Sequence, residues 1–399
     1  MLDRTRRGGV ALLAAALAAC THDDGAVDAL AGSGLPGVTV DTAPVLVLAD
    51  DGTPEKLFQH VSARRLPDGR VAVADHGALT INVFRPDGAF DTTLARRGGG
   101  PGELRGDFHL AARADTLFVL GRPMMSPADV NVFVARGGFL RRFRPEVDNA
   151  PTGLTLHDRL ATGQFFVERG REFRVITRAP EQGRLIPDSI SYGLLPTDAE
   201  GRTGGHVTWL PPVVRWWQFA YPWPNGPMPT AAARYPFAPR TLAVASGDRL
   251  WLIDTDSGRL RAFDGTGRQV VDARLTLEPA PLDAAALDRR RARELAAARR
   301  ALDSSRVRAQ YDPELLPARA PLVAEARAGA DGELWLRLFD VDDAVAPRYV
   351  IVDREGRAIA RATLPAGLDV QQIGRDFVLG VRRDSLDVER VVEYGLRRP

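Results

Sequence analysis

The chain has 399 residues, of which 45% are hydrophobic and 26% charged, with one cysteine and a formal net charge of +2. The hydrophobic fraction excludes a disordered chain, and one cysteine excludes both an intramolecular disulfide and a multi-cysteine metal site. The small net charge argues against a protein that binds nucleic acid through a large cationic field.

The N-terminus has the pattern of a secretory signal peptide. Three arginines stand among the first seven residues, and residues 10–19 form an uncharged run too short to span a bilayer. The run ends in a motif that resembles the lipobox of bacterial lipoproteins, Leu17-Ala18-Ala19-Cys20. The resemblance implies that residues 1–19 are removed as a lipoprotein signal and that the Cys20 thiol receives a lipid. The alternative is an ordinary signal peptide in which Cys20 stands by chance.

These features predict an exported, membrane-anchored lipoprotein. Thr21 follows the cysteine, where Asp would favour retention in the inner membrane, so the outer membrane is expected, on its periplasmic side or at the cell surface. Residues 20–44 are rich in Gly, Asp and Ala and predict a flexible tether between the membrane and the folded domain.

A repeated unit accounts for most of the remaining sequence. In each copy a turn containing Gly or Asp precedes a short apolar strand, and a second strand and another glycine turn follow. The first strands are centred near positions 72, 118, 166, 251, 335 and 378, and most intervals suit a four-stranded propeller blade of about 40–50 residues. The sequence therefore predicts an all-β fold, a six-bladed β-propeller of four-stranded antiparallel blades over residues 45–399.

Two intervals between repeats are long and predict insertions. Residues 178–240 are rich in Trp and Pro and predict a long outer loop, although residues 207–209 leave a seventh blade open. Residues 280–320 contain a helical Leu, Ala and Arg pattern for which Asp283 is a candidate N-cap. The last repeat lacks an outer strand, and we expect residues 45–48 to supply it and close the ring.

Three segments carry a family resemblance. They are 66–73, which reads Leu-Pro-Asp-Gly-Arg-Val-Ala-Val; 98–104, which contains Gly-Pro-Gly-Glu; and 385–394 near the C-terminus. Together they resemble the six-bladed, NHL-like propeller lipoproteins of bacteria, over about residues 45–396. That family is largely uncharacterised, so the resemblance implies a fold and a compartment but no activity.

Three histidines are candidate metal ligands. His109 and His157 each lie nine residues before the centre of a first strand, and His60 lies near the comparable place in the first repeat. Three imidazoles facing a propeller channel suit a zinc ion. The alternative is that each histidine has an ordinary polar role. The sequence accordingly predicts no cofactor and keeps Zn or Ca as an alternative.

An aromatic cluster is the candidate ligand-binding surface. Four of the six tryptophans, Trp209, Trp216, Trp217 and Trp223, lie within fifteen positions of one another. Such rings suit a peptide or glycan, and the alternative is a satellite core that packs the insertion onto the propeller.

No motif of a known reaction stands out, so catalytic residues are not assigned. We expect a lipid-anchored binding or scaffold module of the cell envelope, with the membrane, through its lipid, and a protein or glycan as partners and no nucleic acid. The alternative is a metal-dependent lyase or lactone hydrolase with its site at the propeller channel.

Overall fold

The computed structural model describes residues 34–121, 129–148, 154–169, 183–198, 202–226, 230–279, 281–384 and 386–399. The chain divides into two compact units, residues 1–34 and 35–399, and the fold described here is that of the second. Strands form nearly all of its regular structure. No helix among the described residues is long and apolar enough to cross a membrane.

The first two repeats form regular four-stranded antiparallel sheets. One sheet contains β3 (Val61–Arg65), β4 (Val71–Asp75), β5 (Thr80–Phe84) and β6 (Phe90–Ala95), in that order. The next contains β7 (Phe108–Arg113), β8 (Thr116–Gly121), β9 (Val130–Val134) and β10 (Gly138–Phe143). Gly69 has a φ of +85° in the turn between β3 and β4, a conformation that glycine adopts without strain.

The third sheet decides an alternative that the sequence left open. It contains β12 (Thr155–Arg159), β13 (Phe165–Glu168), β15 (Tyr192–Leu195) and β17 (Thr208–Trp209). Residues 207–209 therefore supply the outer strand of this sheet and do not begin a separate blade, because Gly193 and Leu194 of β15 pair with β17. Residues 173–177, which the repeat pattern placed in a second strand, lie outside the described residues.

The segment predicted as a long loop over 178–240 is largely β-structure where it is described. Beyond β15 and β17, it forms a three-stranded antiparallel sheet in the order β14 (Ile186–Ile190), β18 (Val213–Pro222) and β19 (Thr230–Arg234). We call it the insertion sheet. A short parallel pair joins β11 (Glu146–Val147) to β16 (Gly204–Gly205). The prolines mislead because all those inside this sheet stand at strand ends or on edge strands.

Two further sheets flank the helical insertion in sequence. The first contains β20 (Thr241–Ser246), β21 (Arg249–Asp254), β22 (Arg259–Phe263) and β23 (Gln269–Arg274). The insertion itself forms α2 (Ala284–Ala297) and α3 (Ala301–Gln310), and the Asp283 side chain caps α2 by accepting a hydrogen bond from the Ala285 amide. The second group of strands, β24 (Val323–Ala328), β25 (Leu334–Leu338), β26 (Arg348–Val352) and β27 (Ala358–Thr363), pairs in that order and is one half of a nine-stranded sheet. Single 3-10 turns occur at Pro54–Lys56 and Ala330–Gly332.

The last sheet is completed by the N-terminal part of the domain. β28 (Asp369–Ile373), β29 (Phe377–Arg383) and β30 (Glu389–Arg397) pair in sequence, and β2 (Leu46–Leu48) adds to β30 in antiparallel register, as residues 45–48 were expected to do. The predicted tether is shorter than 20–44, because β1 (Gly37–Val40) is a strand that pairs with both β27 and β30.

Hydrophobic clusters join each sheet to the next. Five clusters of buried side chains span the boundaries between successive sheets, including the boundary between the β28–β30 sheet and the β3–β6 sheet. Across the remaining boundary, β20 contacts β24, and the Ser246 hydroxyl donates to the Glu333 carbonyl at 2.8 Å. The middle strands are buried on both faces, which explains the apolar runs Val71–Ala74 in β4 and Leu117–Leu120 in β8.

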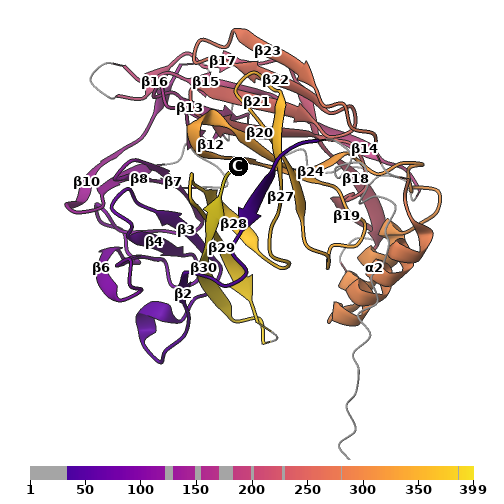
Figure 1. Ribbon diagram of the computed structural model, residues 1–399, viewed down its shortest axis with the longest axis horizontal. Helices are drawn as coiled ribbons and strands as arrows, with labels where there is room; N and C mark the ends of the chain where they lie inside the picture. The colour runs from indigo at the N-terminus through magenta and orange to yellow at the C-terminus, as the bar shows by residue number, and fades with distance from the viewer. Residues whose placement is uncertain are drawn as a thin grey trace, which may run out of the picture. The chain divides into compact units, whose positions relative to one another are not determined.

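The sheets are arranged as a β-propeller (Figure 1). In each sheet one strand precedes the apolar strand of the repeat, and these strands are β3, β7, β12, β20, β24 and β28. Such strands of neighbouring sheets contact one another at five of the boundaries, so they line the centre. We call them the central strands. The insertion sheet and the two helices pack together around Phe219, Tyr235, Phe237 and Tyr311.

Candidate functional site

A charged cavity opens where the insertion sheet, the central strand β24, its neighbour β25 and α2 meet. Its volume is about 270 Å³. Apolar lining comes from Pro236, Val323 and Phe339 among others. The charged lining residues are four arginines and three carboxylates: Arg234, Arg240, Arg290, Arg337, Glu325, Asp340 and Asp343.

A β-bulge in β24 shapes one wall of the cavity. Glu325 stands directly opposite Arg337 of β25, and the register shifts between Val323 and Glu325. A bulge leaves its extra residue outside the regular ladder. Here that residue is Ala324, whose carbonyl accepts a 2.6 Å hydrogen bond from Nη2 of Arg240. The Arg240 amide donates to Thr255 Oγ1 at 2.8 Å, so Arg240 is held from two sides at the cavity wall.

Glu325 links the cavity to the centre of the propeller. Its carboxylate lies 3.4 Å from Arg337 Nη1 and 3.6 Å from Arg327 Nη2, and Arg327 in turn lies 3.8 Å from Asp369 of β28. Burial raises the pKa of Asp369 above its ordinary value, and Arg327 partly offsets that rise. Charged side chains thus continue from the cavity onto the central strands.

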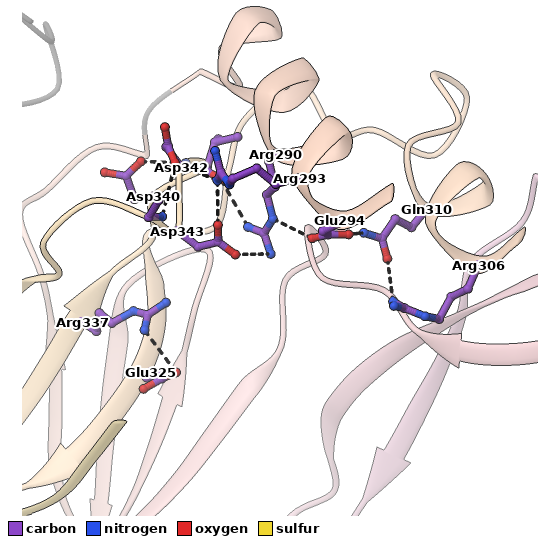
Figure 2. A network of polar contacts seen from close by, with 12 residues as sticks. Arg290, Arg293, Glu294, Arg306, Gln310, Glu325, Arg337, Asp340, Asp342 and Asp343 are labelled. Atoms are coloured by element: carbon purple, nitrogen blue, oxygen red, sulfur yellow. Dashed lines mark hydrogen bonds and ion pairs between the residues drawn. The ribbon is translucent and has the colours of Figure 1, made fainter. Parts of the chain in front are cut away.

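The opposite wall is a network between α2 and the segment after β25 (Figure 2). Arg290 Nε donates to Glu294 at 3.0 Å, and its Nη2 lies 3.5 Å from Asp343. Arg293 bonds to Asp342 and Asp343 at 2.8 Å each. These contacts turn Arg290 and Arg293 of α2 toward the protein itself.

A second polar network lies between the β12–β17 sheet and the insertion sheet. His157 Nε2 is 2.9 Å from Glu168, and Arg215 of β18 bonds to Glu168 and, at 3.0 Å, to Asp188 of β14. Arg215 occupies a second bulge, because Asp188 pairs with Trp216 and Ser189 with Val214.

The environment of this His157 network shifts two pKa values. Burial alone would raise the pKa of Glu168, but the hydrogen bond and charge of His157 and the charge of Arg215 bring it below its ordinary value. Burial and the charge of Glu168 raise the pKa of Tyr192. The Glu168 carboxylate therefore stays ionised at neutral pH, and its contact with Arg215 of β18 links the insertion sheet to the propeller.

Two central strands carry an opposed charge pair. Arg64 of β3 donates to the carbonyls of Ala63 and Gln371, at 2.9 Å and 2.8 Å. Burial raises the pKa of Asp158 on β12 and lowers that of Arg64, while the attraction between the two charges opposes both shifts.

The three predicted histidines lie in different environments. His60 precedes β3 with a φ of +57°, and its ring lies 5.0 Å from that of His76. His109 lies on β7 opposite Leu120, and His157 is bonded to Glu168. Across the described part of the chain, no group of three or more His, Cys, Asp and Glu side chains could hold a metal ion.

The four clustered tryptophans do not form one platform. Trp209 packs against the core between the second and third sheets, and Trp217 packs against the helices. Trp216 follows the bulge and stacks under the Arg215 guanidinium, 3.5 Å from the ring centroid. Trp223 follows β18 and packs on Gly226. Cys20 lies outside the described residues.

Sequence reasoning missed the cavity itself. Arg234, Arg240, Glu325 and Arg337 come from separate segments and share no motif. The signal that could have indicated them is the pair Glu325 and Arg327, charges two positions apart in a strand that opens a repeat.

Comparisons with known proteins find the fold but no family. No protein-family model and no curated protein matches the chain. An exported protein from Bacteroides fragilis is similar in structure, with 12% identity, a TM-score of 0.44, and coverage of 91% of this chain and 95% of that one. The β-propeller domain of Cps50 from Myceliophteria thermophila is 11% identical, with coverage of 89% and 99% and a TM-score of 0.35.

A lyase is also among the similar structures. Virginiamycin B lyase from Staphylococcus aureus, in a catalytically inactive form, is 10% identical, with coverage of 90% of this chain and 99% of that one and a TM-score of 0.36. At such identities no activity passes from these proteins to this chain.

Proposed function

We propose that the protein is an exported lipoprotein whose six-bladed propeller binds a small polar ligand in the charged cavity. The cavity is the observation that carries this proposal. Ligand sites are concave and combine apolar walls with a few convergent polar groups, as this lining does.

Six blades are supported by the repeat spacing and by the packing of each sheet on the next. The β24–β27 and β28–β30 sheets count as separate blades joined at their edges by β1, because β1 pairs with the outer strand of the first and with β30 of the second. Closure by β2 leaves the last blade without an open edge at β30.

Lipid anchoring rests on the N-terminal sequence. The basic start, the apolar run and Cys20 together support cleavage before the cysteine and attachment of a lipid, with Thr21 favouring the outer membrane. Radioactive palmitate tests this in a Gram-negative host. The wild type should be labelled and partition into detergent, and Cys20→Ser should do neither. An unlabelled, water-soluble wild type would contradict the anchor.

Ligand binding is tested by equilibrium dialysis of the purified domain against small molecules extracted from cell envelopes, with mass spectrometry of what is retained. Ala324→Phe should fill the cavity and abolish retention, whereas Ala358→Phe, on an exposed position of β27, should not. If Ala324→Phe does not fold, Arg337→Met serves in its place. Retention of nothing by the wild type, or equal retention by both variants, would contradict the proposal.

The enzyme alternative finds less support. A metal-dependent lyase or lactone hydrolase needs a set of metal ligands, and the described residues do not provide one. His157, one of the two candidates on central strands, is engaged by Glu168. A protein or glycan partner remains part of the proposal as a second ligand class, with Trp216, which stacks on the Arg215 guanidinium, as its candidate aromatic contact.

A further inference from the structure

The charged side chains on the two walls of the cavity differ in how many ion-pair partners they have within the protein. Asp343 is bound by Arg290 and Arg293, and Asp340 lies 3.3 Å from Arg348. Arg290 is in turn held by Glu294, by the Val341 carbonyl and by Asp343. This wall of the cavity is therefore balanced by partners within the protein.

The facing wall carries an excess of positive charge. Arg337 has only Glu325 as an ion-pair partner within the described part of the chain, at 3.4 Å. The side chain of Arg234 has no hydrogen bond or ion pair among the described residues, and its guanidinium lies 5.8 Å from the centroid of the Trp216 ring. Arg240 uses one Nη donor. On this wall the three guanidinium groups of Arg234, Arg240 and Arg337 stand against one carboxylate. That carboxylate, of Glu325, also forms an ion pair with Arg327.

The cavity volume limits the size of the ligand. At about 270 Å³ the cavity lies close to the lower end of the range for small-molecule sites, about 300–1,000 Å³, and so suits a small organic molecule. The apolar side chains of Pro236, Val323 and Phe339 would contact its carbon atoms.

We propose that the cavity takes a small organic acid, whose carboxylate or phosphate group is bound by Arg234, Arg240 and Arg337. This inference rests on the ligand-binding function proposed above. The planar guanidinium group matches both oxyanions and can donate two hydrogen bonds to either. Glu325 acts as an internal competitor: it holds Arg337 in place in the empty cavity and opposes an entering anion.

Isothermal titration with four probes tests the proposal: succinate, inorganic phosphate, neutral succinamide and the dication putrescine. Succinate or phosphate should bind, and succinamide and putrescine should not. Binding of succinate alone assigns a carboxylic acid, and binding of phosphate alone assigns a phosphorylated molecule. Failure of both anions to bind, with or without putrescine binding, overturns the proposal.

Two variants give opposite expectations. Glu325→Gln removes the competing charge and should raise the affinity for the anion about tenfold, whereas Arg337→Gln should lower it at least tenfold. Arg136→Gln, on an exposed arginine paired with Asp68, is the control and should change nothing. If Arg337→Gln does not fold, Arg234→Gln gives the same comparison. A Glu325→Gln variant that binds the anion more weakly overturns the proposal.

The dialysis experiment distinguishes the failure of this inference from the failure of the proposed ligand-binding function. A retained envelope ligand that is neutral or cationic would overturn the inference and leave the binding function standing. Retention of no ligand, together with no binding of any probe, would overturn both.

Discussion

Glu325 and Arg337 stand directly opposite each other on neighbouring strands, with 3.4 Å between the carboxylate and the guanidinium. Opposed charges at such a cross-strand position contribute about 0.2–1 kcal/mol to stability. Glu325 lies on the central strand β24 beside its bulge, and both residues line the cavity that we propose as the binding site.

The closing strand should contribute strongly to stability through one side chain. Leu48 is completely buried between the last sheet and the first, whereas the neighbouring Val47 is 46% exposed. Leu48→Ala should therefore lower the free energy of unfolding by about 2–5 kcal/mol. Val47→Ala should lower it by about 0.5 kcal/mol or less. Urea unfolding measures both, and equal effects would show that β2 does not close the ring as described.

The Gly-Pro-Gly-Glu element owes its glycines to a close approach. Gly102 has a φ of +78°, and a Cβ there would lie 2.8 Å from the Phe139 ring. Gly102→Ala should cost about 2–4 kcal/mol, from backbone strain and the clash together. Gly106, with a φ of +60° and open space around it, separates the two causes. Gly106→Ala should lower the free energy of unfolding by about 1 kcal/mol. Equal losses for the two variants in urea unfolding would show that the contact with Phe139 does not contribute at Gly102.

Arg215 should hold the insertion sheet to the propeller. Its removal leaves the largely buried carboxylates of Glu168 and Asp188 without this guanidinium. Arg215→Ala should lower the free energy of unfolding by about 3 kcal/mol or more. Arg268→Ala, at an exposed ion pair with Asp264, should cost under about 1 kcal/mol. Hydrogen exchange should also quicken in β14 and β18 of the first variant, and unchanged exchange there would contradict the assigned role.

The stability of the fold should decline in acid partly through Glu168. Because its pKa in the folded state is below the ordinary value of 4.5, its contribution is present above that value and is lost as the pH falls through the folded pKa. Glu168→Gln should therefore flatten the fall in unfolding free energy below about pH 5. Glu278→Gln, at a side chain 88% exposed, should leave that slope unchanged. If the unfolding free energy falls with pH equally steeply in both variants, Glu168 is not a source of the acid sensitivity.

Local patterns predicted much of the fold. The apolar runs beside Asp68–Gly69 and similar turns lie in strands, and residues 45–48 contain the closing strand, because turn chemistry and burial act over a few residues. The segment 178–240 was wrongly predicted as a loop because its strand pairing depends on residues far apart in sequence. β17 has two residues and pairs with β15 across a long connection, and prolines at strand ends resemble those of a loop.

The cavity could not be predicted in the same way. Its guanidinium groups were hidden by composition, since 52 of the 53 basic residues are arginines and most are dispersed on the surface. What distinguishes Arg234 and Arg337 is their position in three dimensions, set by a bulge, an insertion sheet and a helix that are far apart in sequence.

The most direct measurement is arginine-specific modification with phenylglyoxal, read by mass spectrometry with and without saturating succinate or phosphate. A ligand in the cavity should protect Arg337 and Arg234 and leave the exposed Arg136 as reactive as before. Equal modification of Arg337 in the presence and absence of the bound anion would contradict the account.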